Sequence, residues 1–547
     1  MSITTIPYPE TGYFSKLVCD YLAEKPELQS FYHRFPNLEN FEKQFEEKKR
    51  EMNLIAERRS LSCHPELVEG QSRTILVNSL NKQYQGITVS KATQKNIDSL
   101  SQKNTFTITT GHQLNLFTGP LYFLYKIFSV INLAEELNKK HSKHHFVPVY
   151  WMATEDHDFE EINYFNLFGA KVAWERESSG AVGELSTEGL EVLLAVLQTT
   201  IGESKNAKKL ISLFSEAYLK HNNLADATRY LANELFSDYG LVILDGNDKE
   251  LKKQFIPFAE KEITENRSFI KVEATTVNLE KIGYKKQVHP REINLFYLTK
   301  GLRERIIEEN GSFKINNTPI VFTKAEILKE LKDHPERFSP NALLRPLYQE
   351  VVLPNLCYVG GGGELAYWFQ LKDYFESVEV TFPILLLRNS VLLVPQKLSK
   401  KLEKLNESID ALFLSTYDLE KKHTHQLSDV IIDFTPQREH LKQQFKELYK
   451  VAEKTDQSFV GAVAAQEKKQ LNGLDYLEKR LLKAEKRKLA DQLNRLTSIQ
   501  DYLFPSESLQ ERTLNFSEFY LEFGEGLFES LKEDLKPLCN EFTIIEL

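Results

Sequence analysis

The sequence has no excess of positive charge. Its 547 residues carry 69 Lys and Arg against 78 Asp and Glu, so the formal net charge is −9 with His neutral. A protein that holds nucleic acid by its phosphates needs a positive field, which this balance does not supply. We therefore expect no nucleic-acid partner.

Cysteine is scarce. The four cysteines, Cys19, Cys63, Cys357 and Cys539, are scattered and lack the paired spacing of zinc ligands. They also do not form the dense pattern of a disulfide framework. We expect reduced thiols, as in a cytoplasm, and no metal site.

Long apolar runs are missing as well. The run around residues 122–134 is interrupted by Lys126, and the run around residues 384–394 is interrupted by Arg388. Both are too short to cross a bilayer. Residues 1–14 have neither the basic stretch nor the apolar run of a secretion signal. These features predict a cytoplasmic protein without a membrane segment.

What is present is enough material for more than one domain. A chain of this length exceeds what one hydrophobic core usually serves, and 41% of its residues are apolar. The composition predicts four segments: a helical N-terminal region packing on the core over 1–100, an α/β core with helical insertions over 101–390, a coiled-coil domain over 391–505, and a C-terminal segment over 506–547 that returns to the core. Within the first segment, residues 60–73 predict a loop.

Alternating strands and helices mark the second segment. The β-branched run Thr105–Thr110 ends at Gly111, a helical stretch over 120–140 follows, and HFVPVYWMA is a second buried strand. This order indicates a parallel βαβ unit. Further strand-like segments are LVIL (241–244), INLFYL, PIVF and PILLL, and a helix is expected to begin near Asp248. We expect a doubly wound sheet, whose ligands lie outside the carboxyl ends of its strands.

Apolar residues at steps of four and three dominate the third segment. The first such seam is Leu398, Leu402, Leu405, Ile409 and Leu412. Thr435 and Pro436 predict a helix start, with the Thr435 hydroxyl as its cap. The seam returns over 441–452 and over 482–503, and stops at Pro505. We predict an antiparallel hairpin arm that also forms a homodimer; a plain helix bundle is the alternative.

The turn after the first strand is one candidate site. Gly111 allows a sharp turn, and Thr118–Pro120 can cap and start the next helix. Free N–H groups at such a helix start attract phosphate or carboxylate. Lys126 is placed to reach the same anion, although a solvated lysine would look alike. The candidate binding residues here are Gly111, His112, Gln113, Thr118, Gly119, Tyr122 and Lys126.

A second candidate follows the next strand, where Glu155, Asp156, His157 and Asp158 stand in succession. Crowded like charges are expected to raise some carboxyl pKa values, which suits acid and base catalysis. A capped, solvated loop and a metal site are alternatives. The position at a strand's carboxyl end favours a catalytic role.

The third candidate is the stretch 339–368, which contains four consecutive glycines at 360–363. Ordering them is entropically unfavourable, so they indicate close approach of a ligand or unusual dihedral angles; a flexible turn is the alternative. Arg345 can grip a carboxylate or phosphate through two parallel hydrogen bonds. The candidate binding residues are Asn341, Arg345, Gln349, Gly361, Gly362, Gly363, Glu364, Tyr367 and Trp368, with Arg388 beyond them.

Four segments together resemble the bacillithiol synthase family, the cysteine ligases called BshC. They are GHQLNLFTGPLYFLYK, PVYWMATEDHDFEEIN, LRPLYQEVVLPNLCYVGGGGELAYW and FPSESLQER, and they spread along nearly the whole chain. The resemblance implies a Rossmann-like core of nucleotidyl-transferase type and a coiled coil used for homodimerisation. It also implies the addition of cysteine to glucosaminyl malate, the last step of bacillithiol biosynthesis.

The family core resembles that of class I aminoacyl-tRNA synthetases. This likeness implies that Gly111–Pro120 takes the place of their HIGH motif, and that ATP activates cysteine as an adenylate nearby. Lys397–Lys400 superficially resembles their KMSKS loop, but the same residues more strongly indicate the start of a Lys-rich helix. The proton acceptor is expected within Glu155–Asp158. The residues expected to hold the malate carboxylates are Arg345, Lys126 or Arg388.

Other classes of protein stay open. One is a non-catalytic partner-binding protein with a degenerate nucleotide-binding core. Another is a metal-dependent hydrolase using Asp156, His157 and Asp158, although no H-E-x-x-H motif supports it. Cys357 could be a covalent nucleophile, yet a thiol in PNLCYV is more typical of a buried apolar position. A second nucleotide site in the coiled coil is a further alternative.

Overall fold

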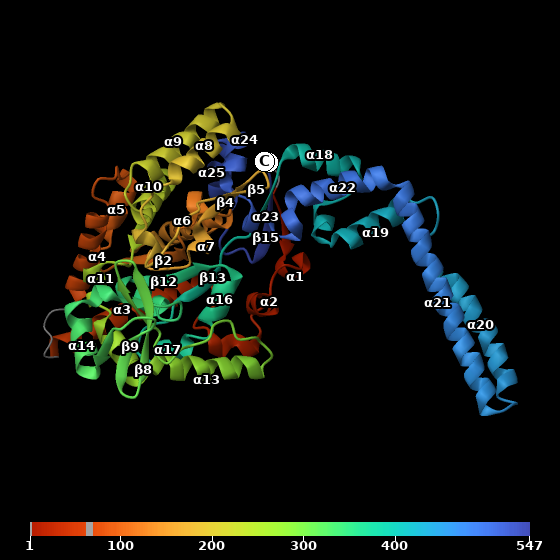
Figure 1. Ribbon diagram of the computed structural model, residues 1–547, viewed down its shortest axis with the longest axis horizontal. Helices are drawn as coiled ribbons and strands as arrows, with labels where there is room; N and C mark the ends of the chain where they lie inside the picture. The colour runs from red at the N-terminus through yellow and green to blue at the C-terminus, as the bar shows by residue number, and fades with distance from the viewer. Residues whose placement is uncertain (1–2, 62–68) are drawn as a thin grey trace. The chain divides into compact units, whose positions relative to one another are not determined.

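The computed structural model describes residues 3–61 and 69–547. The chain forms two compact units. Unit 1 contains Met1–Leu392 and Gln510–Ile545, and unit 2 contains Leu393–Leu509 with the last two residues. Figure 1 follows the chain through both units by colour.

A five-stranded parallel sheet lies at the centre of unit 1. Its order is β13-β12-β2-β3-β6, and all four strand pairs are parallel. From β2 the chain builds outward to β3 and β6 on one side, and then to β12 and β13 on the other. This is a doubly wound, Rossmann-like order, whose direction reverses between β2 and β12. The strands are β2 (Thr105–His112), β3 (His145–Met152), β6 (Val242–Asp245), β12 (Asn355–Gly360) and β13 (Ile384–Leu387).

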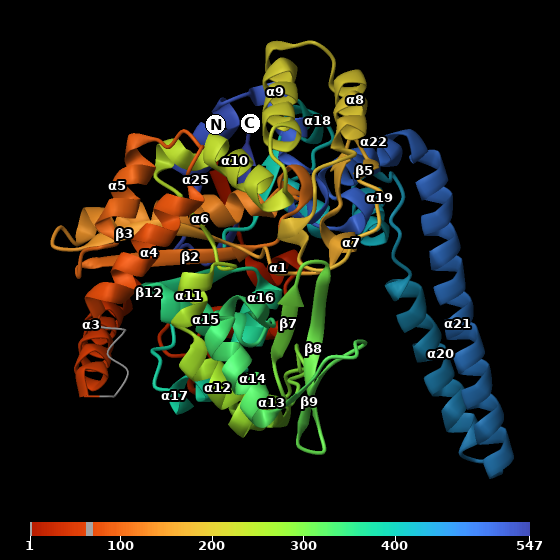
Figure 2. The same cartoon turned by 60° about the vertical axis from the view of Figure 1, so that its left-hand side comes forward.

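The predicted βαβ unit is confirmed. All eight residues of β2 are buried, as expected for a strand covered on both faces. Helix α6 (Tyr122–Lys140) connects β2 to β3 and packs on both strands (Figure 2). The strand predicted over 241–244 is β6, and Asp248 caps the short helix α11 (Lys249–Lys253).

The predicted start of α6 is wrong. The helix begins at Tyr122, and no side chain caps it. Phe117 and Thr118 instead take left-handed backbone conformations, with φ of 49° and 69°. Asn515 supports this turn by donating to the carbonyl oxygens of Phe117 and Gly119, at 2.8 and 2.7 Å. The connection is therefore shaped by a contact with a residue almost 400 positions away.

The loop predicted over 60–73 is corrected in part. Residues 62–68 lie outside the described residues, but helix α4 begins at Glu69, so 69–73 are helical. Helices of the N-terminal region are α1 (Tyr8–Thr11), α2 (Lys16–Leu22), α3 (Leu38–Leu61), α4 (Glu69–Gln83) and α5 (Lys91–Ser99). Helices inserted between β3 and β7 include α7 (Phe159–Ile162), α8 (Leu190–Ile201), α9 (Lys205–Leu219), α10 (Leu224–Phe236), α12 (Ile256–Glu265) and α13 (Arg267–Lys281).

A second, antiparallel sheet occupies residues 295–340. Its order is β10-β9-β8-β7-β11. INLFYL and PIVF are strands as predicted, but they belong to this sheet and not to the parallel one (Figure 2). The reason is the tight turn at Gly301, which has φ of 72° and can join only antiparallel neighbours. The strands are β7 (Leu295–Thr299), β8 (Leu302–Glu309), β9 (Ser312–Ile315), β10 (Val321–Thr323) and β11 (Phe338–Pro340).

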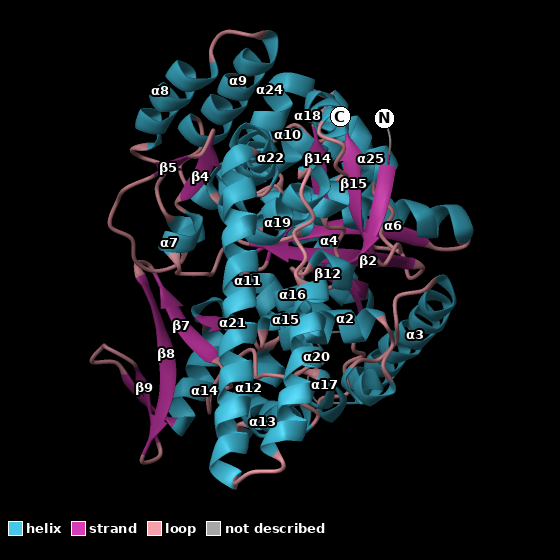
Figure 3. Cartoon of the chain, turned by 90° about the vertical axis from the view of Figure 1, so that its right-hand side faces the viewer, coloured by secondary structure: helices cyan, strands magenta, loops and turns pink. Residues whose placement is uncertain are grey.

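The last segment of the chain contributes to unit 1. Strand β15 (Glu541–Glu546) pairs antiparallel with β1 (Ile3–Pro7), so the two ends of the chain lie side by side (Figure 3). Helices α23 (Gln510–Thr513), α24 (Phe516–Phe523) and α25 (Gly526–Asp534) precede β15.

Unit 2 contains an antiparallel helical hairpin, which confirms the predicted coiled coil. Arg438 on α20 (Thr435–Ala452) pairs with Asp475 on α21 (Gln457–Lys488), and further along α20 Tyr449 bonds Glu467. Phe445, Ala452 and Val463 form the buried seam. The other α-helices of unit 2 are α18 (Gln396–Lys404), α19 (Thr416–Leu427) and α22 (Ala490–Leu503).

Two local predictions in unit 2 are wrong. The leucine seam over 398–412 is not one helix, because α18 ends at Lys404 and Asn406 turns left-handed with φ of 53°. Thr435 is the first helical residue and not the cap; its N–H donates to Asp433. Lys397–Lys400 lies within α18, which agrees with the favoured interpretation of these residues as the start of a Lys-rich helix. Of the helices in residues 3–61 and 69–547, none has the length and apolar character to span a bilayer.

Candidate active site

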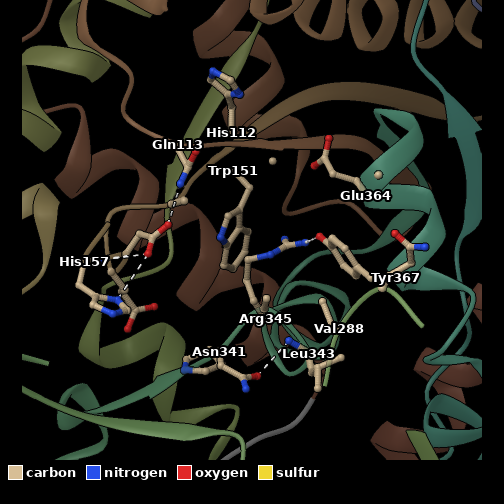
Figure 4. A pocket seen from close by; sticks show the side chains of 18 of the residues that line it. His112, Gln113, Trp151, His157, Val288, Asn341, Leu343, Arg345, Glu364 and Tyr367 are labelled. Atoms are coloured by element: carbon tan, nitrogen blue, oxygen red, sulfur yellow. Dashed lines mark hydrogen bonds and ion pairs between the residues drawn. The ribbon is translucent and has the colours of Figure 1, made fainter. Parts of the chain in front are cut away.

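A cavity of about 880 Å³ opens at the carboxyl ends of β2, β3 and β12. This is the point where the strand order reverses, the usual ligand site of doubly wound sheets. All three predicted segments reach it, although they are separated in sequence by up to 250 positions. The lining includes Gly111 and His112 from the first segment, Asp156 and His157 from the second, and Gly361 and Glu364 from the third. Figure 4 labels His112, His157 and Glu364.

The structure brings together most of the predicted site residues. Those lining the cavity are Gly111, His112, Gln113, Tyr122, Lys126, Glu155, Asp156, His157, Asn341, Arg345, Gly361, Gly362, Gly363, Glu364, Tyr367 and Arg388. Five do not line it: Thr118, Gly119, Asp158, Gln349 and Trp368. Asp158 is exposed, while Gln349 and Trp368 are buried behind lining residues.

Three of the N–H groups at the start of α6 are not free for the predicted anion. The Leu121 N–H donates to Leu514, the Phe123 N–H to Pro120 and the Leu124 N–H to Leu121. These donors are thus taken by the chain itself. Lys126 does line the cavity, but its ammonium donates to the Gly111 carbonyl at 2.9 Å and pairs with Glu364 at 2.5 Å.

Glu364 is the best-satisfied carboxylate of the cavity. Besides Lys126, it accepts from the Tyr358 hydroxyl at 2.6 Å and from the Gly361 N–H at 2.9 Å. Burial alone would raise the pKa of Glu364, but the Lys126 charge and these donors lower it below its usual value. Glu364 is therefore an ionised residue that fixes the start of α16 (Gly362–Trp368) against α6.

The four glycines form an ordered helix start and not a flexible turn. None has a positive φ, so unusual dihedral angles do not explain them. Close packing explains two of them: a Cβ would lie 2.9 Å from Leu365 at Gly360, and 3.0 Å from Val18 at Gly362. A Cβ at Gly363 would meet nothing within 4 Å, which leaves that position open.

Arg345 is held by a buried polar network. Its guanidinium donates to Gln349 at 2.8 Å and to Tyr367 at 3.3 Å, as Figure 4 shows for Tyr367. Gln349 in turn donates to Glu350, which also accepts from Asn355. Burial raises the pKa of Glu350 to about 7. This network sets the direction of Arg345 toward the cavity.

Arg388 is buried and already paired. Its two terminal nitrogens donate to Glu511 at 3.0 and 2.7 Å, and one of them also donates to Ser390. Glu511 is fully buried. Only Nε of Arg388 has no hydrogen-bond partner among the described residues. Arg388, one of the three residues expected to hold the malate carboxylates, therefore has no free fork for a substrate, since both terminal nitrogens bind Glu511.

The acidic loop differs from the prediction in its electrostatics. Asp156 accepts from Gln113 at 3.0 Å and from the His157 N–H at 2.8 Å. Burial would raise the pKa of Asp156, but these hydrogen bonds and the nearby Arg303 hold it well below its usual value. Glu155 pairs with the buried Lys252 at 2.5 Å. The expected rise in pKa from crowded like charges is thus wrong for Asp156.

His112 is a neutral ring at the end of β2. Burial and the charges of Lys126 and Arg388 lower the pKa of His112 well below its usual value. Its Nε2 is buried and has no hydrogen-bond partner among the described residues. The ring lies against Tyr122 and Phe123, which fixes its orientation.

Sequence reasoning missed the cationic residues that come from the second sheet and the C-terminal segment. The missed lining residues include His289, Arg291, Arg303, Arg305 and Arg512. One signal was available: Arg303 and Arg305 are two positions apart in a strand, which puts both side chains on one face.

Two alternative chemistries find little support in the geometry. Cys357 lies fully buried in β12 and does not line the cavity, and burial raises the pKa of its thiol. Within the described residues, no three His, Cys, Asp or Glu side chains gather as metal ligands.

The fold and the cavity define a Rossmann-like protein with a ligand site at its topological switch point, joined to a coiled coil. Residues 1–389 match the family model described as "Bacillithiol biosynthesis BshC, N-terminal Rossmann-like domain". Residues 391–547 match the model of the C-terminal coiled-coil domain of the same family. The chain therefore belongs to the BshC family, as the sequence resemblance predicted.

Curated relatives agree along the full length. The chain is 55% identical to a "Putative cysteine ligase BshC" of Christiangramia forsetii, over 100% of this chain and 99% of the relative. It is equally similar to the protein of that name in Flavobacterium johnsoniae, over 100% of both chains. A Bacillus cereus relative of the same name is 28% identical, also over 100% of both.

Proposed function

We propose that this protein is a ligase that joins cysteine to glucosaminyl malate through an amide bond, the last step of bacillithiol biosynthesis. The main support is that the segments around Gly111, Asp156 and Gly361 line one cavity. This cavity lies where the strand order of the parallel sheet reverses. Relatives identical at more than half of all positions carry the name of a cysteine ligase, which supports the cysteine half of the proposed reaction.

Forming an amide from a carboxylate needs an activated acyl group, and we propose ATP as its source. Cysteine's carboxylate would displace pyrophosphate from ATP, and the amine of glucosaminyl malate would then displace AMP. Gly111 lines the cavity, and a Cβ there would stand 3.1 Å from the Tyr358 hydroxyl, so a larger residue would crowd this wall. Gly111, Gln113 and Gly361–Gly363 are the residues that would border the nucleotide.

The attacking amine must release a proton, and we assign its acceptance to Glu155. One oxygen of Glu155 faces Lys252, while the other has no partner among the described residues. Asp156 is a weaker candidate because its pKa is held low. His157 accepts from Arg303 at Nδ1, which makes its other ring nitrogen a donor when the ring is neutral. Glu155→Gln should therefore lower kcat more than it raises either KM.

The coiled coil is proposed to form a homodimer. Leu448, Val451 and Phe459 on α20 and α21 are exposed apolar residues, which a partner helix could cover. Light scattering on the full chain tests this: a dimer is expected for the wild type, and a monomeric mass would contradict the proposal.

Reconstitution tests the reaction. Purified full-length protein receives cysteine and glucosaminyl malate with and without ATP, and mass spectrometry follows the thiol product. Serine in place of cysteine is the matched control. Product that depends on ATP and is accompanied by pyrophosphate supports both parts of the proposal. Product without nucleotide rejects the adenylate, and no product in any mixture rejects the ligase.

A further inference from the structure

Two groups of basic side chains line the cavity, and Arg512 of the C-terminal segment lies outside both groups. We call the lining residues Lys126, Arg345 and Arg388 the sheet wall, because they follow β2, precede β12 and follow β13. We call His289, Arg291, Arg303 and Arg305 the hairpin wall, because they come from the segment before β7 and from β8. The two walls differ in how many of their side chains already have a hydrogen-bond or ion-pair partner within the protein.

Each cation of the sheet wall has a partner within the chain. Lys126 pairs with Glu364, and Arg388 pairs with Glu511. Arg345 donates to Gln349 and Tyr367, and its guanidinium lies over the Tyr358 ring at 5.4 Å. A substrate anion that binds Lys126 or Arg388 must compete with a carboxylate that is already in place.

The hairpin wall is different. Arg291 and Arg305 line the cavity, and neither side chain has a hydrogen-bond or ion-pair partner among the described residues. Arg303 lies between Arg291 and Arg305 in the sequence, and its side chain is held by contacts. It donates to Ser339 and His157, and its guanidinium carbon lies 4.0 Å from the centre of the Phe296 ring. No carboxylate forms an ion pair with Arg303 within the described residues.

The charge of the whole cavity is strongly positive. Seven Lys and Arg side chains line it against three Asp and Glu side chains, an excess of four positive charges. Adding Lys252 and Glu511, the partners just outside the lining, leaves this excess unchanged. The chain as a whole has a net charge of −9, so the excess is local. Such a field favours a ligand with several negative charges.

We propose that Arg291 and Arg305 bind the two carboxylates of the malate half of the amine substrate. The inference rests on the proposed function and moves the malate site from Lys126 and Arg388 to the hairpin wall. Arginine suits the role because its planar fork donates two parallel hydrogen bonds to one carboxylate. Arg303, stacked on Phe296, is a positioning residue that keeps the neighbouring side chains of β8 directed at the cavity.

Steady-state kinetics on the full-length protein test the assignment. Arg291→Met and Arg305→Met keep much of the side-chain length and remove the charge. Each is expected to raise KM for glucosaminyl malate about 10- to 100-fold, as for the loss of a charged hydrogen bond, while KM for cysteine stays within about twofold. Lys300→Met removes a charge from the turn of the same hairpin, outside the cavity lining, and should change neither KM.

A substrate analogue sharpens the test. Glucosaminyl lactate lacks one carboxylate of glucosaminyl malate. The wild type should bind it more weakly than the natural substrate, whereas the variant that has lost the matching arginine should discriminate less. If the wild type forms product and a variant has an unchanged KM for glucosaminyl malate, the substituted arginine does not bind malate. The proposed ligase activity would still stand. Absence of product from the wild type rejects the ligase itself.

Binding of free malate gives a readout that does not need turnover. Calorimetry with the wild type should show binding that Arg291→Met and Arg305→Met each weaken and Lys300→Met does not. Equal malate affinity in all four proteins would overturn the inference, and circular dichroism of the variants checks that they are folded.

Discussion

The two walls of the cavity use the same type of side chain under different conditions. In the sheet wall, Arg388 is almost completely buried and its fork is occupied by Glu511. In the hairpin wall, Arg305 is half-buried and has no partner among the described residues. A buried charge with a partner is needed by the fold, because removing one member leaves the other unsatisfied. An unpartnered charge in a cavity is available to a ligand.

The strongest test of this contrast is Arg388→Met. The substitution leaves the Glu511 carboxylate buried without its cation. We therefore expect the free energy of unfolding to fall by about 3–5 kcal/mol. Urea unfolding followed by tryptophan fluorescence measures this, since Trp151, Trp174 and Trp368 all lie in unit 1.

The double variant Arg388→Met, Glu511→Leu is the control, because it removes both charges. It should regain most of the lost stability. If the single variant were as stable as the wild type, the pair would not hold the fold, and the contrast between the walls would fail.

Glu350 allows a pH test behind the sheet wall. Its folded-state pKa of about 7 lies above the unfolded value of 4.5, so the protonated form is favoured by folding. The stabilisation of the folded state by protonated Glu350 is fully present below pH 4.5 and is lost as the pH rises through 7. The shift corresponds to about 3 kcal/mol.

Glu350→Gln does not titrate and keeps an oxygen for Gln349 and Asn355. The free energy of unfolding of Glu350→Gln, relative to that of the wild type, should therefore rise by up to about 3 kcal/mol between pH 4 and pH 8. Unfolding free energies at both pH values check this, and parallel pH profiles of the two proteins would contradict it.

The smallest effect on stability is expected for Arg305→Met. Removing an unpartnered charge from a positive cavity breaks no ion pair, so the free energy of unfolding should change by no more than about 0.5 kcal/mol. The same urea experiment, with Lys300→Met beside it, gives the measurement. A loss comparable to that of Arg388→Met would show that Arg305 supports the fold.

Local sequence patterns predicted the parallel sheet well. The β-branched run at β2, the helix after it and the buried strand at β3 each show their own periodicity, so a single stretch of sequence is enough. The same reasoning placed INLFYL in the wrong sheet, since a strand pattern does not say which strand will be its neighbour. It also missed Asn406, whose left-handed turn ends a helix that the leucine spacing would continue.

The site was predictable mainly where its residues follow a parallel strand, with Asn341 and Arg345 before β12 as the exceptions. Gly111, Asp156 and Gly361 meet because carboxyl ends of parallel strands share one edge. Arg291 precedes β7 and Arg305 lies in β8, so neither follows a strand of the parallel sheet. The spacing of Arg303 and Arg305 indicates a shared face but not the cavity that this face lines. Arg388 looked available for a ligand because its partner, Glu511, is 123 residues away.

The return of the C-terminal segment has a consequence for biosynthesis. Glu511 and nearly all of β15 belong to unit 1, yet the ribosome makes them only after residues 393–509 of unit 2. At ordinary translation speeds, the 123 residues between Arg388 and Glu511 take about 10 s to synthesise. During that interval Arg388 has no carboxylate to meet and β1 has no strand beside it. The catalytic unit therefore completes its folding at the end of synthesis, although most of its residues emerge first.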